Sequence, residues 1–216
     1  LEFRRVLFRS VVSMYICPYN TSWLLAQRYR FVPTGINKAE VDLRNVMRML
    51  WEQHIVWTRM TIISIIKNLP DEDLVIKRLL RNPLDFKQVL KHFYGDEIAS
   101  QFSELFKSHL VIAAQLVKAA KNGDNKGAAD AEKRWYANAD EIAVFLGKIN
   151  PYWSQEDWRT MLYDHLRMTK SEAVDILTKN YAQGITEYDE IEKQALKMAD
   201  VMAEGIAKQF LYRFEG

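Results

Sequence analysis

Residues 43–67 read LRNVMRMLWEQHIVWTRMTIISIIK, and the apolar side chains in this stretch recur at steps of three and four positions. Because an α-helix turns once every 3.6 residues, that spacing places the apolar side chains on one helical face. The pattern begins at Ala39 and ends near Asn68, just before Pro70. We therefore predict a long amphipathic helix over residues 39–68, whose apolar face packs against other helices.

The same periodicity returns along the rest of the chain. Further helical patterns, two short and four long, cover residues 71–81, 84–93, 96–121, 128–148, 155–181 and 187–213. Eight glycines and five prolines are few for 216 residues, which favours long regular elements. The predicted fold class is all-α: an up-down antiparallel bundle of four to five long helices plus two short bridging helices. We find no internal repeat in the sequence.

The two ends of the chain are expected to differ in character. Residues 1–10, LEFRRVLFRS, resemble a translated sequencing adaptor, and we interpret them as an artefact. Residues 11–38 lack helical periodicity and are expected to be irregular, which leaves residues 39–216 as a single helical-bundle domain. Setting aside the three arginines and one glutamate of the first segment changes the formal charge from +2 to zero. A neutral chain with interspersed charges argues against a nucleic-acid partner.

Membrane insertion and disulfide chemistry are also disfavoured. The longest apolar runs are shorter than the ~20 residues that a membrane helix needs. Residues 14–39 lack the layout of a secretion signal, so we expect a cytoplasmic protein. Cys17 is the only cysteine, which excludes an intramolecular disulfide and a cysteine-based zinc site. The sequence is compatible with a homo-oligomer.

Four of the predicted long helices each carry one polar residue near the middle of an otherwise apolar face. These residues are His54, His109, Asn138 and His165. At a rise of about 1.5 Å per residue, each lies within about one turn of its helix midpoint. Up-down packing would bring all four to a similar height, so the sequence predicts a polar layer inside the bundle.

One interpretation of this layer is a transition-metal site. Imidazole binds zinc and iron, and three histidines with an open position form a known catalytic zinc arrangement. His54, His109 and His165 would then be the metal ligands. The sequence contains neither the Glu-x-x-His pairs of di-iron bundles nor His-Glu-x-x-His, so the layer matches no familiar metal motif.

The layer also fits a small-molecule pocket. Trp57 and Trp135 are expected to flank it, and in an enzyme one histidine would act as a general base there. Arg59 is a candidate clamp for a carboxylate or phosphate, although we favour a salt bridge to Glu52 or Asp140. Our leading hypothesis is a small-molecule- or metal-binding bundle. In the alternative, a structural or interaction protein, the buried histidines only set helix register.

Five stretches of the chain resemble an uncharacterised family of small helical proteins from bacteria, chiefly Gram-positive spore-formers. They are LWEQHIVWTRMTIIS (50–64), RLLRNPLDF (78–86), WYANADEIA (135–143), NPYW (150–153) and MLYDHL (161–166). The resemblance covers about residues 43–210 and implies a helical fold. Some members of that family carry the label acetylglutamate kinase. Such a kinase has a glycine-rich α/β fold, and this chain has neither strand patterns nor phosphate loops.

Overall fold

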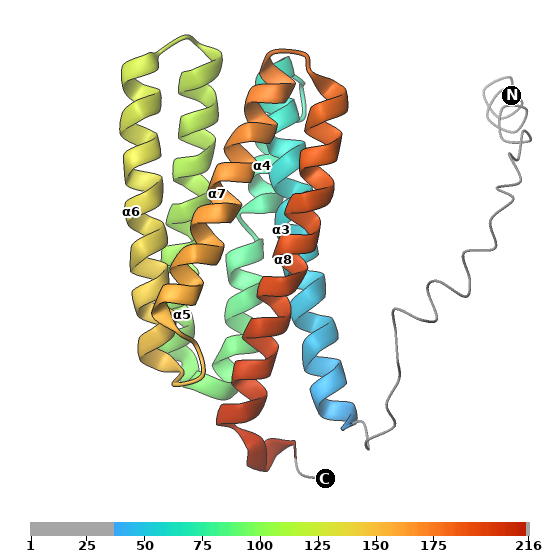
Figure 1. The fold of residues 1–216 in the computed structure, drawn as a ribbon, viewed down its shortest axis with the longest axis vertical. Helices are drawn as coiled ribbons and strands as arrows, with labels where there is room; N and C mark the ends of the chain where they lie inside the picture. Colours follow the sequence, from blue (N-terminus) through green and yellow to red (C-terminus); the bar gives the residue numbers. More distant parts are fainter. Residues whose placement is uncertain (1–36, 215–216) are drawn as a thin grey trace, which may run out of the picture. The chain divides into compact units, whose positions relative to one another are not determined.

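The computed structural model describes residues 37–214, so the predicted adaptor (residues 1–10) and nearly all of the predicted irregular segment (residues 11–38) lie outside the described residues. The described chain forms α3 (Lys38–Lys67), α4 (Glu72–Leu79), α5 (Asn82–Lys121), α6 (Asn125–Ile149), α7 (Gln155–Leu177), α8 (Tyr181–Gln209) and the 3-10 helix η1 (Leu211–Arg213). Residues 37–214 contain no β-strand, and the predicted all-α fold is confirmed (Figure 1). No helix in this range combines the length and apolar character required to cross a membrane.

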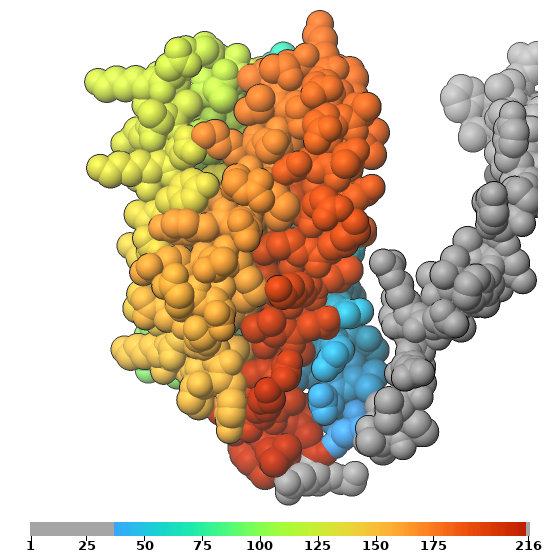
Figure 2. Space-filling view, viewed as in Figure 1, coloured from blue at the N-terminus to red at the C-terminus, as the bar shows by residue number. Residues whose placement is uncertain are grey.

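The helices run alternately in opposite directions and form an up-down bundle. In Figure 1, α3 rises, α4 and the first limb of α5 (residues 82–94) descend, and the second limb of α5 (residues 96–121) rises. Then α6 descends, α7 rises and α8 descends. The space-filling view shows α6, α7 and α8 side by side (Figure 2). Because α3 also packs against α8, the bundle is closed around its core.

Gly95 separates the two limbs of α5. Its backbone angles, φ 80° and ψ 169°, lie in a region that is accessible almost only to glycine. The first limb corresponds to the short helix predicted at residues 84–93. Its side chains Phe86 and Leu90 are fully buried, so this limb contributes to the core as the long helices do.

The junction between α7 and α8 lies earlier than the sequence pattern indicated. The helix predicted at residues 155–181 ends at Leu177, and α8 begins at Tyr181. Gly184, which falls in the predicted gap between the two helices, lies inside α8. A Cβ at this position would come within 3.3 Å of the Asp175 Cβ. The glycine therefore allows α8 to pack closely against α7 and does not terminate a helix.

Gly95→Ala should destabilise the protein by about 1–3 kcal/mol, because a residue with a Cβ is strained in this backbone region. No heavy atom lies within 4 Å of the added Cβ, so the cost comes from the backbone alone. Urea denaturation measures the change. Ser108→Ala, an exposed substitution on the same helix, should alter the free energy of unfolding by less than about 0.5 kcal/mol. Equal stabilities of the two variants would contradict the assigned role of Gly95.

Candidate functional site

The predicted polar layer (His54, His109, Asn138 and His165) is buried in the bundle. The exposed fractions are 2% for each histidine and 5% for the asparagine. The four residues belong to α3, α5, α6 and α7, one on each helix. Their side chains therefore lie in the core, where each polar group needs a hydrogen-bond partner.

The layer consists of two hydrogen-bonded pairs. His109 Nδ1 lies 2.9 Å from Asn138 Oδ1. His54 Nε2 lies 3.4 Å from His165 Nε2. The Phe106 ring contacts both pairs, with its centroid 4.9 Å from that of His54 and 6.2 Å from that of His109. The structure thus brings His54 and His165 together and gives His109 a different partner.

A fifth polar side chain, Gln194 of α8, joins the layer. Its Oε1 lies 3.1 Å from His165 Nδ1. The predicted polar layer did not include this residue. The signal is present, since Gln194 lies three residues after Ile191 and four before Met198, which are both buried on the same face.

One hydrogen-bond pattern occurs three times in the described chain. In each case a side-chain amide donates to the backbone carbonyl of the residue four positions before a layer histidine. The three bonds are Asn82 Nδ2 to Leu50 O (2.9 Å), Asn138 Nδ2 to Leu105 O (3.1 Å) and Gln194 Nε2 to Met161 O (2.8 Å). Asn82 therefore docks α5 onto α3, and its side chain does not cap the helix.

The repetition is also present in the sequence. The three histidines follow one another at steps of 55 and 56 residues, and the three amides at steps of 56. Around the histidines the chain reads LWEQHI (50–55), LFKSHL (105–110) and MLYDHL (161–166). The bundle is thus built from three helical hairpins that share one internal pattern: α3 with the first limb of α5, the second limb of α5 with α6, and α7 with α8. The expectation of no repeat is wrong.

The amides determine which ring nitrogens carry hydrogen. Because Asn138 and Gln194 use their NH2 groups on carbonyls, their oxygens accept, and His109 and His165 donate from Nδ1. A neutral ring with hydrogen on Nδ1 has a bare Nε2. His165 Nε2 therefore accepts from His54 Nε2, and His54 Nδ1 is left without hydrogen.

The first hairpin lacks the histidine–amide bond that the other two possess. His54 Nδ1 and Asn82 Oδ1 occupy the corresponding places, and both are buried without a hydrogen-bond partner. The hydrogen positions explain this difference, because both atoms are acceptors. The bond from His54 to His165 takes the place of a bond to Asn82 and links the first hairpin to the third.

Burial keeps the layer histidines neutral. It lowers the pKa of His109 to about 3, an effect that the Asn138 hydrogen bond only partly opposes. Burial also lowers the pKa of His165 to about 4 and that of His54 well below its ordinary value. The neighbouring histidines lower the pKa of His54 further, because a second positive charge in the layer would be repelled.

The layer does not fit the predicted three-histidine zinc or iron site. Two imidazole nitrogens, on His54 and His165, face each other, whereas zinc sites use three or four protein ligands. His109 bonds to Asn138, an amide that is a poor ligand for these metals. Among residues 37–214, no group of three or more histidine, cysteine, aspartate or glutamate side chains is arranged to hold a metal ion.

The remaining predicted site residues divide between the core and the surface. Trp135 is buried with its ring centroid 5.3 Å from that of His109, as expected for a residue that flanks the layer. Trp57 is partly exposed under the Arg78 guanidinium, so its predicted place beside the layer is wrong. Trp51 occupies that place, with its ring centroid 5.7 Å from that of His54.

Arg59 forms a salt bridge, but with a partner that the sequence did not indicate. It pairs with the buried carboxylate of Glu172, and it donates to the Gly184 carbonyl at 3.2 Å. Glu52 and Asp140, the expected partners, are not its salt-bridge partners. Burial raises the pKa of Glu172 to about 7, although Arg59 lowers it in part. The Arg59 guanidinium is therefore engaged between helices and is not available as a ligand clamp.

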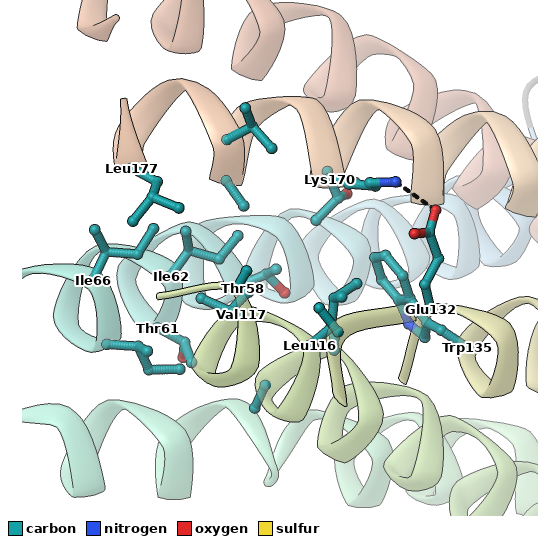
Figure 3. Close-up of a pocket in the computed structure, with 18 of the residues that line it drawn as sticks. Thr58, Thr61, Ile62, Ile66, Leu116, Val117, Glu132, Trp135, Lys170 and Leu177 are labelled. Carbon is teal, nitrogen blue, oxygen red and sulfur yellow. Dashed lines mark hydrogen bonds and ion pairs between the residues drawn. The ribbon is translucent and has the colours of Figure 1, made fainter. Parts of the chain in front are cut away.

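A cavity of about 290 Å³ lies one helical turn beyond the polar layer (Figure 3). We call it the axial cavity, because Thr58, Ala113 and Thr169, each four residues after a layer histidine, all line it. Most of its other lining residues are apolar. Trp135, Glu132 and Lys170 lie at one end, and Ile66 and Leu177 lie at the other.

Three buried polar atoms of the lining residues have no hydrogen-bond partner in the described structure. They are Thr61 Oγ1, Thr169 Oγ1 and Trp135 Nε1. The charged lining residues within residues 37–214, Glu132 and Lys170, pair with each other at 2.6 Å. The cavity thus combines apolar walls with a few uncommitted donors and acceptors, which is typical of small-molecule sites.

Comparisons of the chain with protein-family models, with curated proteins and with solved structures found no match. The family resemblance carried by the five sequence stretches therefore stays a prediction.

His109→Leu and Asn138→Leu should each destabilise the protein by about 2 kcal/mol, because each leaves a buried polar group without its partner. The double variant should lose about 1–2 kcal/mol less than the sum of the two single losses. Urea denaturation of the four proteins completes the cycle. Gln183→Leu, which removes an exposed amide on α8, is the control and should be near neutral. Additive losses would show that the two residues are not coupled.

The free energy of unfolding should fall as the pH drops from about 6.5 to about 4. In this window the unfolded histidines bind protons and the folded ones do not, which costs about 1.4 kcal/mol per pH unit for each of three histidines. Glu172, whose pKa is raised to about 7, has the opposite sign and offsets roughly one histidine. The net slope should therefore be about 3 kcal/mol per pH unit.

Urea denaturation at a series of pH values measures this slope. The His109→Leu/Asn138→Leu double variant should show a slope smaller by about 1.4 kcal/mol per pH unit, since one histidine is gone. A stability that stays constant between about pH 7 and about pH 5 would contradict the neutral, buried layer.

Proposed function

We propose that this protein binds a small, largely apolar molecule in the axial cavity. The cavity carries this proposal through its size, its apolar walls and its place in the fold. At about 290 Å³ it lies near the lower end of the volumes of ligand pockets. It is also about twice as large as an engineered cavity that holds benzene. A guest of one to three aromatic rings, or of a medium-length alkyl chain, matches this space.

The polar layer supports the proposal because it fixes the helices at one end of the axial cavity. Thr58 and Thr169 lie one turn beyond His54 and His165, and Trp135 contacts His109. The layer bonds hold α3, α5, α6 and α7 in register, and the same helices line the cavity. Helices that are fixed at one height hold the walls of a pocket in place without a ligand.

A structural role for the layer is the second candidate. The repeated amide–carbonyl bonds favour it, because they fix the height of both helices in each hairpin. In this case the layer would only set helix register, and the cavity would bind nothing specific. The two candidates differ in one measurable property, which is saturable binding of an apolar probe.

N-phenyl-1-naphthylamine is a suitable probe, since it is neutral and fluoresces strongly in apolar surroundings. We expect one probe molecule to bind per protein, with a dissociation constant in the micromolar range. Ala113→Leu projects a larger side chain into the cavity and should weaken binding by about tenfold or more. Fluorescence titration measures both values.

Ala119→Leu is the matched control, because Ala119 lies on the same helix with similar burial and does not line the cavity. It should bind the probe as the unmodified protein does. Circular dichroism establishes that each variant is folded, and Ala173→Leu replaces Ala113→Leu if the latter does not fold. Absence of saturable binding, or equal affinities of Ala113→Leu and the unmodified protein, would favour the structural role.

A further inference from the structure

Two of the three uncommitted polar atoms of the axial cavity lie near one end. Trp135 and Thr169 are buried, and the indole Nε1 and hydroxyl Oγ1 have no partner in the described structure. Trp135 lies three residues after Glu132, and Thr169 directly precedes Lys170. The 2.6 Å ion pair between Glu132 and Lys170 joins α6 to α7 at this level. The indole and the hydroxyl therefore belong to facing helices at the same end of the cavity.

The opposite end of the cavity is mostly apolar. Ile66 and Leu177 lie there, farthest from Trp135, and Ile62, Leu116 and Val117 line the space between (Figure 3). Thr61, on α3, carries the third uncommitted polar atom of the lining and lies toward the Ile66 end (Figure 3). A guest that matches this distribution has an apolar body along the cavity and a hydrogen-bonding group at the Trp135 end.

The chemistry of that end selects a neutral acceptor. An indole N–H only donates, so the guest must present an oxygen that accepts, whereas a threonine hydroxyl can donate or accept. An ionised head group would need a counter-charge when it is buried. Lys170 is already paired with Glu132, and burial keeps the layer histidines neutral.

We infer that the axial cavity accepts a neutral, elongated molecule with a terminal hydroxyl or carbonyl group, held by Trp135 Nε1 and Thr169 Oγ1. This inference rests on the proposed function and specifies the class of ligand. The alkyl chain of the guest points toward Leu177. Molecules of this class include medium-chain alcohols and ketones.

Displacement of bound N-phenyl-1-naphthylamine by four eight-carbon compounds tests the inference. The compounds are 1-octanol, 2-octanone, octanoate and octane, which differ only in the head group. We expect the alcohol and the ketone to bind about tenfold more tightly than octanoate or octane. Trp135→Phe should remove most of this advantage for the ketone, because phenylalanine has no N–H group, and should leave octane binding unchanged. Thr169→Val is a second variant with the same expected direction.

Trp57→Phe is the matched control, since Trp57 undergoes the same chemical change and lies outside the cavity. It should preserve the preference for the alcohol and the ketone. Tightest binding of octanoate would overturn the inference in favour of a carboxylate ligand. Equal binding of all four compounds would overturn the head-group inference alone. Failure of the probe and of all four compounds to bind would instead overturn the proposed function.

Discussion

A histidine ring that is buried away from water needs a hydrogen-bond partner, and this requirement organises the bundle. Asn138 and Gln194 meet it for His109 and His165, and each amide also donates to a carbonyl of the helix that carries the histidine. Two bonds from one short side chain fix both the rotation and the height of a helix pair. His54 then joins the first hairpin to the third through His165. The choice of which ring nitrogens carry hydrogen is therefore fixed, and it depends on every side chain of the layer.

The layer divides the interior into two parts with different packing. On one side, aromatic rings such as Trp51, Phe86 and Phe106 fill the core with contacts between ring centroids of 5.3 to 5.8 Å. On the other side, small residues such as Ala113 and Ala173 leave the axial cavity. The polar layer thus separates a tightly packed region, which stabilises the fold, from a region that is able to receive a guest.

Helical periodicity was sufficient to predict the long helices and the four buried polar positions, because burial on one face leaves a pattern in the sequence. Periodicity did not predict which side chains contact each other across helices. Trp51 and Trp57 each lie three residues from His54, on opposite sides of it, and only the neighbouring helices decide which ring enters the core. Arg59 likewise bonds to a carboxylate that is distant in sequence. The repeat is weak in the sequence because the three hairpins share few residues other than the histidines and their apolar neighbours.

The hairpin construction also has a consequence for the order of assembly. Within the second and third hairpins, the histidine and its amide are separated by 29 residues. The seam between α3 and α8 instead joins Arg48 to Asp200 across 152 residues. Closing a short loop costs less chain entropy than closing a long one, and local contacts form fastest. We therefore expect the two C-terminal hairpins to form first and the α3–α8 contact, which closes the bundle, to form last.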